Sequence, residues 1–367
     1  MSGSSAKRIL IMAGGTGGHV FPALAVASEL RQRGYAVDWV GTRRGLEQRV
    51  VPAAGIPLHH LVVRGVRGKG LLDRVLGLCM LGFSSLQALW LVLRLRPAAV
   101  VGMGGYVAGP AGLAAWLCRR PLVIHEQNAV AGTTNRLLAP LARRILAGFA
   151  GAFSDGREVT VVGNPVRSDL LAAAREAGYD YRGQRPLRLL VLGGSLGAQP
   201  INQVIPPVLR ALRESAEADF EVWHQTGEAH AGAVAEEYAR LKLADVRVAP
   251  FIEDMAAAYA WADLVICRAG ALTVAEIAIM GRPAILVPLP HAIDDHQTAN
   301  ARALADCGGA LLLRQQEMTV QSLTSALTAY TKYPERLQNM ARAAHAAAAP
   351  DATLSVVNVV EELAHAA

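Results

Sequence analysis

The stretch ILIMAGGTGGHVF at residues 9–21 decides the fold. Its five apolar residues, 9–13, predict a short buried strand that ends in a glycine-rich loop at 14–18. A helical pattern follows over 23–33, and a second apolar strand is predicted at 36–40. A strand, a glycine loop, a helix and a second strand in this order are typical of the opening of a parallel α/β sheet.

The same order recurs in the second half, where an apolar strand at 187–192 runs into the loop GGSLGA at 193–198. A chain of 367 residues is too long for one ordinary core. We therefore expect an α/β protein with two Rossmann-like parallel α/β/α domains, which face each other across a ligand-binding cleft at the carboxyl ends of their strands. Residues 163–165 and 179–186 are typical of linkers, which places the boundary near residue 165. Further strands are predicted at 98–102, 121–125, 246–249, 264–267 and 284–288.

The charge and the cysteines limit the classes of partner. A formal charge of +6 favours anionic partners. No Lys/Arg run exceeds two residues and no basic stretch is interleaved with aromatics, so we expect no nucleic acid. The cysteines form no CxxC pair, which argues against a disulfide framework or a thiolate zinc site. The alternating His and Asp residues of 291–297 are weak evidence for a metal and suit hydrogen bonds to sugar hydroxyls at least as well, so we expect no metal and no cofactor.

The glycine loops indicate phosphate binding, because consecutive glycines let backbone N–H groups approach an anion at a helix N-terminus. For a single loop, a tight turn that needs a positive φ is the alternative. The first loop lacks the dinucleotide fingerprint, since Val20 stands where a third glycine or alanine belongs. Asp38 lies inside its predicted strand rather than at the end, which also counts against NAD or FAD.

Two polar positions follow predicted strands of the first half. His19 begins the helix, where the partly positive helix end favours the neutral imidazole that a general base requires. Glu126 could act as base, orienter or hydrogen-bonding partner, and Asn128 offers a donor and an acceptor to a sugar hydroxyl. The alternatives are a packing or capping histidine and a helix-capping carboxylate.

In the second half, residues 266–276 predict a strand, a glycine turn and a helix start. The N–H groups around 271–273 can hold a phosphate, and Glu276 can accept hydrogen bonds from a ribose diol. A capping box that pairs Glu276 with Thr273 is the alternative.

Residues 75–93 carry no charge and meet the length rule for a transmembrane helix. We do not expect one, because the glycine loops on both sides belong to one sheet, and we expect two helical pieces instead. The first of them, beside basic residues, is typical of a surface that lies on anionic lipid, and a buried helix with a solvated basic loop is the alternative. The basic residues are Arg64, Arg67, Lys69 and Arg74.

Several motifs, in order from about residue 7 to residue 300, resemble the MurG family, the peptidoglycan N-acetylglucosaminyltransferases that convert lipid I to lipid II. They are residues 14–22, 67–70, 102–106, 125–128, 163–167, 193–195 and 267–276. Leu196, Ala269 and His296 depart from residues that are common in that family. These departures bear on the sugar contacts rather than on a proposed catalytic group.

The resemblance implies a GT-B fold with an acceptor and membrane-associating domain at 1–165, a donor domain at 166–347 and a C-terminal helix at 348–367 that packs back on the first domain. It implies UDP-N-acetylglucosamine as donor and undecaprenyl-pyrophosphoryl-N-acetylmuramyl-pentapeptide (lipid I) as acceptor. The transfer inverts the anomeric centre and needs no metal. The resemblance also implies a peripheral location on the anionic cytoplasmic face of the bacterial inner membrane.

The site residues that the resemblance implies divide by substrate. His19 and Glu126 are the catalytic candidates, and the acceptor pyrophosphate is placed at Thr16, Gly17 and Gly18. The donor contacts are Asn128, Arg167, Ser195, Ile252, Ala271, Leu272, Thr273, Val274, Ala275, Glu276 and Gln297. Among these, Glu276 meets the ribose, Arg167 and Ile252 meet the uracil, and Asn128 and Gln297 meet the transferred sugar.

Two other classes stay open from the residues alone. The glycine loops also occur in nicotinamide and flavin oxidoreductases, and a membrane-surface scaffold could bind lipid pyrophosphates without catalysis.

Overall fold

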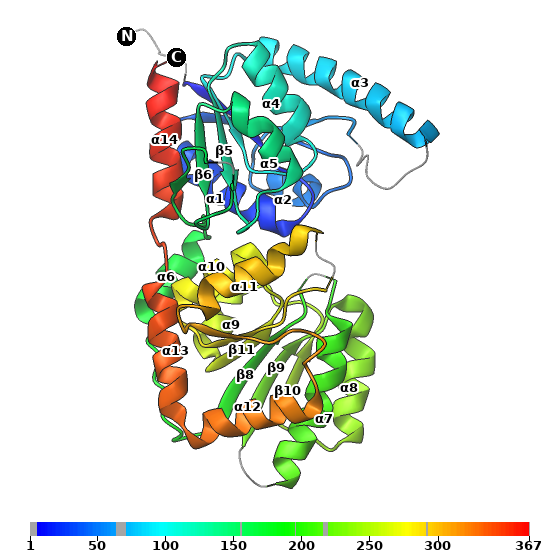
Figure 1. The fold of residues 1–367 in the computed structure, drawn as a ribbon, viewed down its shortest axis with the longest axis vertical. Helices are drawn as coiled ribbons and strands as arrows, with labels where there is room; N and C mark the ends of the chain where they lie inside the picture. The colour runs from blue at the N-terminus through cyan, green and yellow to red at the C-terminus, as the bar shows by residue number, and fades with distance from the viewer. Residues whose placement is uncertain are drawn as a thin grey trace. The chain divides into compact units, whose positions relative to one another are not determined.

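The computed structural model describes residues 6–63, 71–154, 156–194, 196–215, 219–290 and 293–366, without the side chains of 71–79 and 293. The chain forms two compact units (Figure 1). Unit 1 comprises Met1–Arg167 together with Pro350–Ala367, and unit 2 comprises Ser168–Ala349.

The elements of unit 1 are β1 (Arg8–Met12), α1 (Gly17–Gln32), β2 (Ala36–Gly41), α2 (Glu47–Ala53), β3 (Leu58–His60), α3 (Leu71–Leu95), β4 (Ala99–Gly102), α4 (Ala108–Leu117), β5 (Leu122–Glu126), α5 (Thr133–Leu138), η1 (Ala139–Leu141), β6 (Arg144–Ala147), β7 (Thr160–Val161) and α14 (Ala352–Ala366). Those of unit 2 are α6 (Ser168–Glu176), β8 (Leu187–Leu192), α7 (Gln199–Glu214), β9 (Phe220–Gln225), η2 (Glu228–His230), α8 (Ala231–Arg240), β10 (Val246–Ala249), α9 (Met255–Trp261), β11 (Leu264–Cys267), α10 (Ala271–Met280), β12 (Ala284–Leu286), η3 (Ile293–Asp295), α11 (His296–Ala305), β13 (Ala310–Leu312), α12 (Val320–Lys332) and α13 (Pro334–Ala346).

Each unit is built on one parallel sheet. The strand order is β3-β2-β1-β4-β5-β6-β7 in unit 1 and β10-β9-β8-β11-β12-β13 in unit 2. The chain reverses direction across the sheet between β1 and β4 and again between β8 and β11, and ligands of such sheets bind beyond the strand ends at this point. The predicted fold of two doubly wound α/β domains is confirmed.

The strand β1 shows why both faces of its sheet must be covered. Ile9 and Ile11 belong to a core cluster that includes α1 and α14. Leu10 and Met12 belong to a second cluster that includes α3 and α4. Because successive side chains of a strand point to opposite faces, this apolar strand is stable only between two helical layers.

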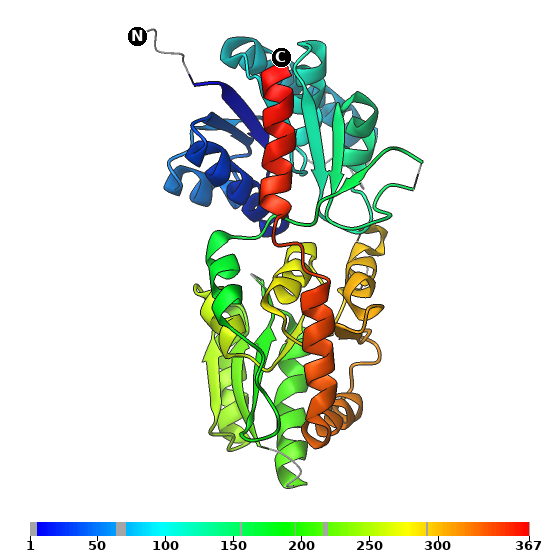
Figure 2. The same ribbon diagram turned by 90° about the vertical axis from the view of Figure 1, so that its left-hand side faces the viewer.

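The C-terminal helix α14 belongs to unit 1 (Figure 2). Its buried Val356 and Val360 join the core cluster of β1 and α1. At its polar edge, Arg33 Nη1 lies 2.5 Å from Glu361 Oε2, and Lys7 Nζ donates to the Ala364 carbonyl at 3.1 Å. Packing and polar contacts together tie the end of the chain to the first sheet.

The prediction of two helical pieces within 75–93 is wrong, because α3 is one helix from Leu71 to Leu95. Ser84 and Ser85, in the middle of this helix, both donate their hydroxyls to the Leu81 carbonyl. Serine hydroxyls that bond to the preceding turn are satisfied without ending a helix. Among the residues that the structure describes, no helix combines the length and the apolar character needed to cross a bilayer.

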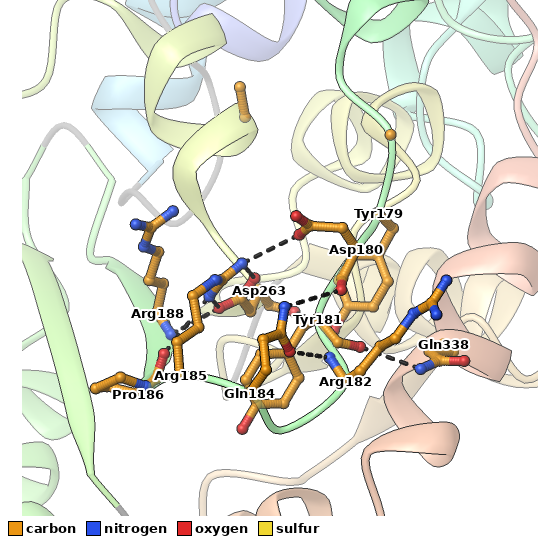
Figure 3. Close-up of polar contacts among 12 residues, drawn as sticks. Tyr179, Asp180, Tyr181, Arg182, Gln184, Arg185, Pro186, Arg188, Asp263 and Gln338 are labelled. Carbon is orange, nitrogen blue, oxygen red and sulfur yellow. Dashed lines mark hydrogen bonds and ion pairs between the residues drawn. The ribbon is translucent and has the colours of Figure 1, made fainter.

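Residues 179–186, which were expected to be linker, are held firmly in unit 2 by Asp263 (Figure 3). The Asp263 carboxylate accepts from Arg185 Nη2 at 2.9 Å and from the Arg188 backbone N–H at 2.9 Å. Its backbone carbonyl accepts from the Tyr179 hydroxyl at 3.1 Å. The hydrogen bonds with Asp263 raise the pKa of Arg185, so this segment is anchored by an ion pair rather than free.

Candidate active site

The glycine loop between β1 and α1 is tied to a buried carboxylate. Glu47 Oε2 accepts from the Gly15 N–H at 3.0 Å, and Glu47 Oε1 accepts from the Thr42 N–H at 2.8 Å and from Thr42 Oγ1 at 2.7 Å. A Cβ added at Gly14 or Gly41 would lie 2.8 or 2.6 Å from a Glu47 side-chain atom. These glycines therefore make room for Glu47, besides giving the loop its shape.

His19 lies where the loops after β1, β4 and β5 meet. Its Nδ1 lies 2.7 Å from Gln127 Oε1, just beyond the end of β5. Gly104, with φ +98°, packs so closely that a Cβ there would lie 2.8 Å from His19 Nδ1. The imidazole is half-buried and is held between the Gln127 amide and the Gly104 backbone.

Glu126 is buried and holds the loop that follows β5. Its Oε1 accepts from the backbone N–H and the side-chain amide of Asn128, at 3.0 and 3.1 Å. Its Oε2 accepts from the Gly132 N–H at 3.0 Å and from Asn135 Nδ2 at 2.8 Å. Both carboxylate oxygens are thus engaged within the loop, an arrangement that suits positioning of Asn128 better than proton abstraction.

In unit 2, Glu276 projects from α10 and is mostly buried. The Tyr259 hydroxyl donates to Glu276 Oε2 at 3.1 Å. The helix begins at Ala271 with Gly270 as N-cap, so Thr273 lies within the first turn. The capping-box interpretation of Glu276 and Thr273 is therefore wrong, because Thr273 is not the capping residue.

The second glycine loop follows β8, and Gln225 at the end of β9 anchors it. The Gly194 N–H donates to Gln225 Oε1 at 2.9 Å, and Gln225 Nε2 donates to the carbonyls of Gly194 and Pro250 at 3.0 Å. Gly194 has φ +76°, a conformation that glycine adopts without strain. Ser195 lies outside the described residues.

Three other residues predicted to contact the donor are Ile252, Gln297 and Arg167. Ile252 is buried just after β10. Gln297, in the first turn of α11, accepts from the Leu289 N–H at 2.9 Å. Arg167 is the last residue of unit 1 and stacks over the Phe21 ring of α1, with its Cζ 5.8 Å from the ring centroid.

The described residues contain no group of three or more His, Cys, Asp or Glu side chains that could hold a metal ion. His291 of the predicted His/Asp loop lies outside them, as do Arg64, Arg67 and Lys69.

Sequence comparison places both units in one enzyme family. Residues 9–147 match the glycosyltransferase family 28 N-terminal domain, and residues 188–355 match its C-terminal domain. The chain belongs to glycosyltransferase family 28.

Relatives within this family are similar over nearly the whole chain. A protein of Stutzerimonas stutzeri, named UDP-N-acetylglucosamine–N-acetylmuramyl-(pentapeptide) pyrophosphoryl-undecaprenol N-acetylglucosamine transferase, is 54% identical over 98% of this chain and 99% of its own. A protein of the same name from Cellvibrio japonicus is 51% identical over 97% of this chain and 98% of its own. The crystal structure of Acinetobacter baumannii MurG has a TM-score of 0.82 and 42% identity, covering 97% of this chain and 99% of that chain. The resemblance and the GT-B fold expected from the sequence are confirmed.

Membership of family 28 also decides against the oxidoreductase class. Asp38, the candidate ribose acid of that class, lies 2.7 Å from His59 Nε2 and 3.4 Å from Arg8 Nη1. Its carboxylate is buried and neutralised by residues of its own sheet, so it is a structural residue.

Three residues of these sites were missed by the sequence analysis: Glu47, Gln127 and Tyr259. Gln127 lies within the quoted motif 125–128, so proximity to Glu126 was a signal. Glu47 lies 32 residues from Gly15 and Tyr259 lies 17 residues from Glu276, and their sequence context carries no sign of these contacts.

Proposed function

We propose that this family 28 chain transfers N-acetylglucosamine from UDP-N-acetylglucosamine to the 4-hydroxyl of the N-acetylmuramyl unit of undecaprenyl-pyrophosphoryl-N-acetylmuramyl-pentapeptide, giving lipid II for peptidoglycan synthesis. The observation that carries the proposal is the similarity to relatives named for this transfer, which extends over both units. An enzyme of this kind needs an acceptor site with a base and a donor site for the nucleotide. Unit 1 is proposed as the acceptor domain and unit 2 as the donor domain.

In unit 1, His19 is the proposed general base. The acceptor O–H bond breaks as His19 takes the proton, the oxygen bonds to the donor anomeric carbon, and the bond from that carbon to UDP breaks with inversion. Glu126 is assigned a positioning role, since both of its oxygens accept hydrogen bonds in its own loop. The acceptor pyrophosphate is placed at Thr16, Gly17 and Gly18, where the first N–H groups of α1 have no intrahelical acceptor.

In unit 2, the N–H groups at the start of α10 are proposed to meet the charge of the UDP phosphates. Glu276 then accepts hydrogen bonds from the ribose hydroxyls, and the Tyr259 hydroxyl holds the carboxylate in place. The other proposed donor contacts follow the family resemblance. In unit 2 they are Ser195, Ile252, Ala271, Leu272, Thr273, Val274, Ala275 and Gln297, and in unit 1 they are Asn128 and Arg167.

A membrane contact is proposed on α3, which lies beside α4 (Figure 1). Among its described side chains, four large apolar ones are more than half exposed: Phe83 by 55%, Leu86 by 67%, Trp90 by 61% and Leu93 by 58%. Their spacing of three and four residues puts them on one helix face, which fits insertion of that face at an anionic cytoplasmic membrane surface. Sedimentation with anionic vesicles at low and high salt tests this contact, and no binding at low salt would refute it.

Incubation with UDP-N-acetylglucosamine and a lipid I analogue tests the activity, with UDP release and the disaccharide lipid as readouts. Replacement of a general base typically lowers turnover ~100- to 10,000-fold, so His19→Ala is expected to lose turnover in this range with little change in donor affinity. Absence of UDP release by the parent protein would refute the transfer. Unchanged turnover in His19→Ala would remove only the base assignment.

A further inference from the structure

Two residues of the 125–128 motif have no role in the transfer as described so far. His125 and Gln127 lie at the end of β5 and are almost completely buried. His125 Nε2 lies 2.9 Å from the Gly163 carbonyl oxygen, and Gln127 Nε2 lies 3.0 Å from His125 Nδ1. Gln127 Oε1 in turn lies 2.7 Å from His19 Nδ1. A continuous chain of hydrogen bonds therefore runs from a backbone carbonyl to the candidate base.

The direction of every hydrogen bond in this chain follows from its first member. A backbone carbonyl only accepts, so His125 Nε2 carries a proton and donates to Gly163. In a neutral imidazole the other nitrogen then accepts, so His125 Nδ1 takes a hydrogen bond from Gln127 Nε2. That leaves Gln127 Oε1 facing His19, and an amide oxygen accepts only. His19 Nδ1 must therefore donate, which leaves the lone pair on His19 Nε2.

This assignment assumes that His125 is neutral and that the Gln127 amide is oriented with its oxygen toward His19, and the structure supports both assumptions. Burial lowers the pKa of His125 to about 4, so this imidazole is neutral near pH 7. The amide of Gln127 is also fixed, because its Nε2 donates to the His125 carbonyl at 3.2 Å as well as facing His125 Nδ1. A flipped amide would place its oxygen against two acceptors and its NH₂ group against His19, so the flip loses both contacts.

We infer that His125 and Gln127 are positioning residues that hold His19 in the tautomer with its proton on Nδ1 and its lone pair on Nε2. The consequence of this tautomer for catalysis rests on the proposed function, in which His19 is the base, because a base needs a free lone pair directed at the substrate. Free imidazole in water places its proton on either nitrogen, so without this chain of bonds part of the His19 population would carry the proton on Nε2 and could not accept another there. The Gly104 backbone adds to the restraint by packing on the ring beside Nδ1.

The first test measures the tautomer directly by ¹⁵N NMR of the full-length protein labelled at histidine, with the His19 signals assigned by their loss in His19→Asn. In the parent protein at neutral pH, we expect His19 Nδ1 to appear as the protonated nitrogen and Nε2 as the unprotonated one. A predominant Nε2–H tautomer in the parent protein would overturn the inference. This readout needs no substrate and is independent of whether the chain transfers sugar.

The second test replaces the linking amide. Gln127→Leu removes the hydrogen bonds of this side chain to His19, to His125 Nδ1 and to the His125 carbonyl. It is expected to mix the His19 tautomers and to lower kcat roughly 10- to 100-fold, less than loss of the base itself. Gln127→Glu retains an acceptor for His19 Nδ1 but loses the donor that faces His125. Because only the acceptor acts directly on His19, this variant is expected to keep the His19 tautomer and more of the turnover than Gln127→Leu. If Gln127→Leu does not fold, the parent and Gln127→Glu spectra still decide the inference.

A matched control is available in the same unit. Gln48 Oε1 lies 2.5 Å from His60 Nε2 in a surface pair outside the site, so Gln48→Leu makes the same chemical change without touching His19. Gln48→Leu should leave the His19 spectrum and kcat unchanged. An unchanged His19 tautomer in folded Gln127→Leu would overturn the inference. A third outcome is a changed His19 tautomer in Gln127→Leu together with full activity in His19→Ala. This outcome would contradict the base role of His19 in the proposed function but would support the hydrogen-bond assignment.

Discussion

The buried carboxylate of Glu47 allows the glycine loop after β1 to be perturbed by one atom. Its Oε1 accepts two hydrogen bonds from Thr42, and its Oε2 accepts the Gly15 N–H. In Glu47→Gln one of these oxygens becomes an NH₂ group. We expect the oxygen to stay with Thr42, because there it accepts from two donors, the Thr42 N–H and hydroxyl, whereas at Gly15 it would accept from one. The Gly15 N–H then faces a second donor and has no acceptor.

The size of the effect follows from the burial of the two partners. A buried donor without an acceptor costs ~1 to 3 kcal/mol. Glu47 is fully buried but Gly15 is exposed, so water can reach the amide once the loop moves slightly. We therefore expect a cost near the lower end, ~1 to 2 kcal/mol, which corresponds to a roughly 5- to 30-fold change in the equilibrium for opening this amide.

Hydrogen exchange of the Gly15 amide, followed by NMR, measures this equilibrium. Exchange in Glu47→Gln should be faster by the factor given above, and amides of unit 2 should be unaffected. Glu29→Gln is the control, since Glu29 on α1 pairs with Arg33 on the surface and does not touch the loop. The same exchange rate for Gly15 in Glu47→Gln and in the parent protein would refute the claim that this carboxylate holds the glycine loop.

Other predictions concern both units. Glu276→Ala should weaken UDP binding by ~1.5 to 3 kcal/mol in calorimetry, and Tyr259→Phe by less, ~0.5 to 1.5 kcal/mol; equal affinity in the parent and both variants would exclude Glu276 from the donor site. Leu363 is a buried residue of α14, and Leu363→Ala should lower the free energy of unfolding of unit 1 by ~2 to 5 kcal/mol in chemical denaturation. Destabilisation of unit 2 in place of unit 1 would contradict the assignment of α14 to unit 1. Burial lowers the pKa of His224 to about 3, well below the value near 6.5 of an unfolded histidine. Between these two pH values only the unfolded state binds the proton. The free energy of unfolding of unit 2 should therefore fall by up to ~1.4 kcal/mol for each pH unit below 6.5. The effect would be excluded if the denaturation midpoint were no lower at pH 5 than at pH 6.5, or if it decreased by the same amount in His224→Gln.

The strands were predictable because each is a short apolar run with a loop signal at its end. The predictions at 187–192, 246–249 and 264–267 coincide with β8, β10 and β11. The helix α3 was less predictable, because its glycines and serines are common both in loops and in packed helices. The backbone of α3 is helical throughout, and the hydrogen bonds of the Ser84 and Ser85 hydroxyls explain why these residues do not end it.

The site was predictable in its parts but not in its connections. His19 and Glu276 stand out because they follow glycine turns at helix starts. The partners that fix them come from distant segments: Gln127 is 108 residues from His19, and Tyr259 is 17 residues from Glu276. Side-chain contacts of this kind depend on how the sheet aligns the strand ends, which a single sequence does not encode at any one position.

The two glycine loops have similar sequences, yet their anchors differ in charge, and this difference bears on which substrate each loop suits. Glu47 brings a carboxylate beneath the loop of unit 1, whereas the neutral amide of Gln225 holds the loop of unit 2. At an effective dielectric constant of about 20, a unit anion some 6 Å from a carboxylate is opposed by ~3 kcal/mol. An anion at Gly15 would meet this repulsion, and one at the N–H groups of Gly17 and Gly18 would be farther along the loop and nearer the helix end. The difference in charge between the anchors therefore supports the proposed assignment of the nucleotide diphosphate to unit 2 and of the lipid pyrophosphate to the start of α1 in unit 1.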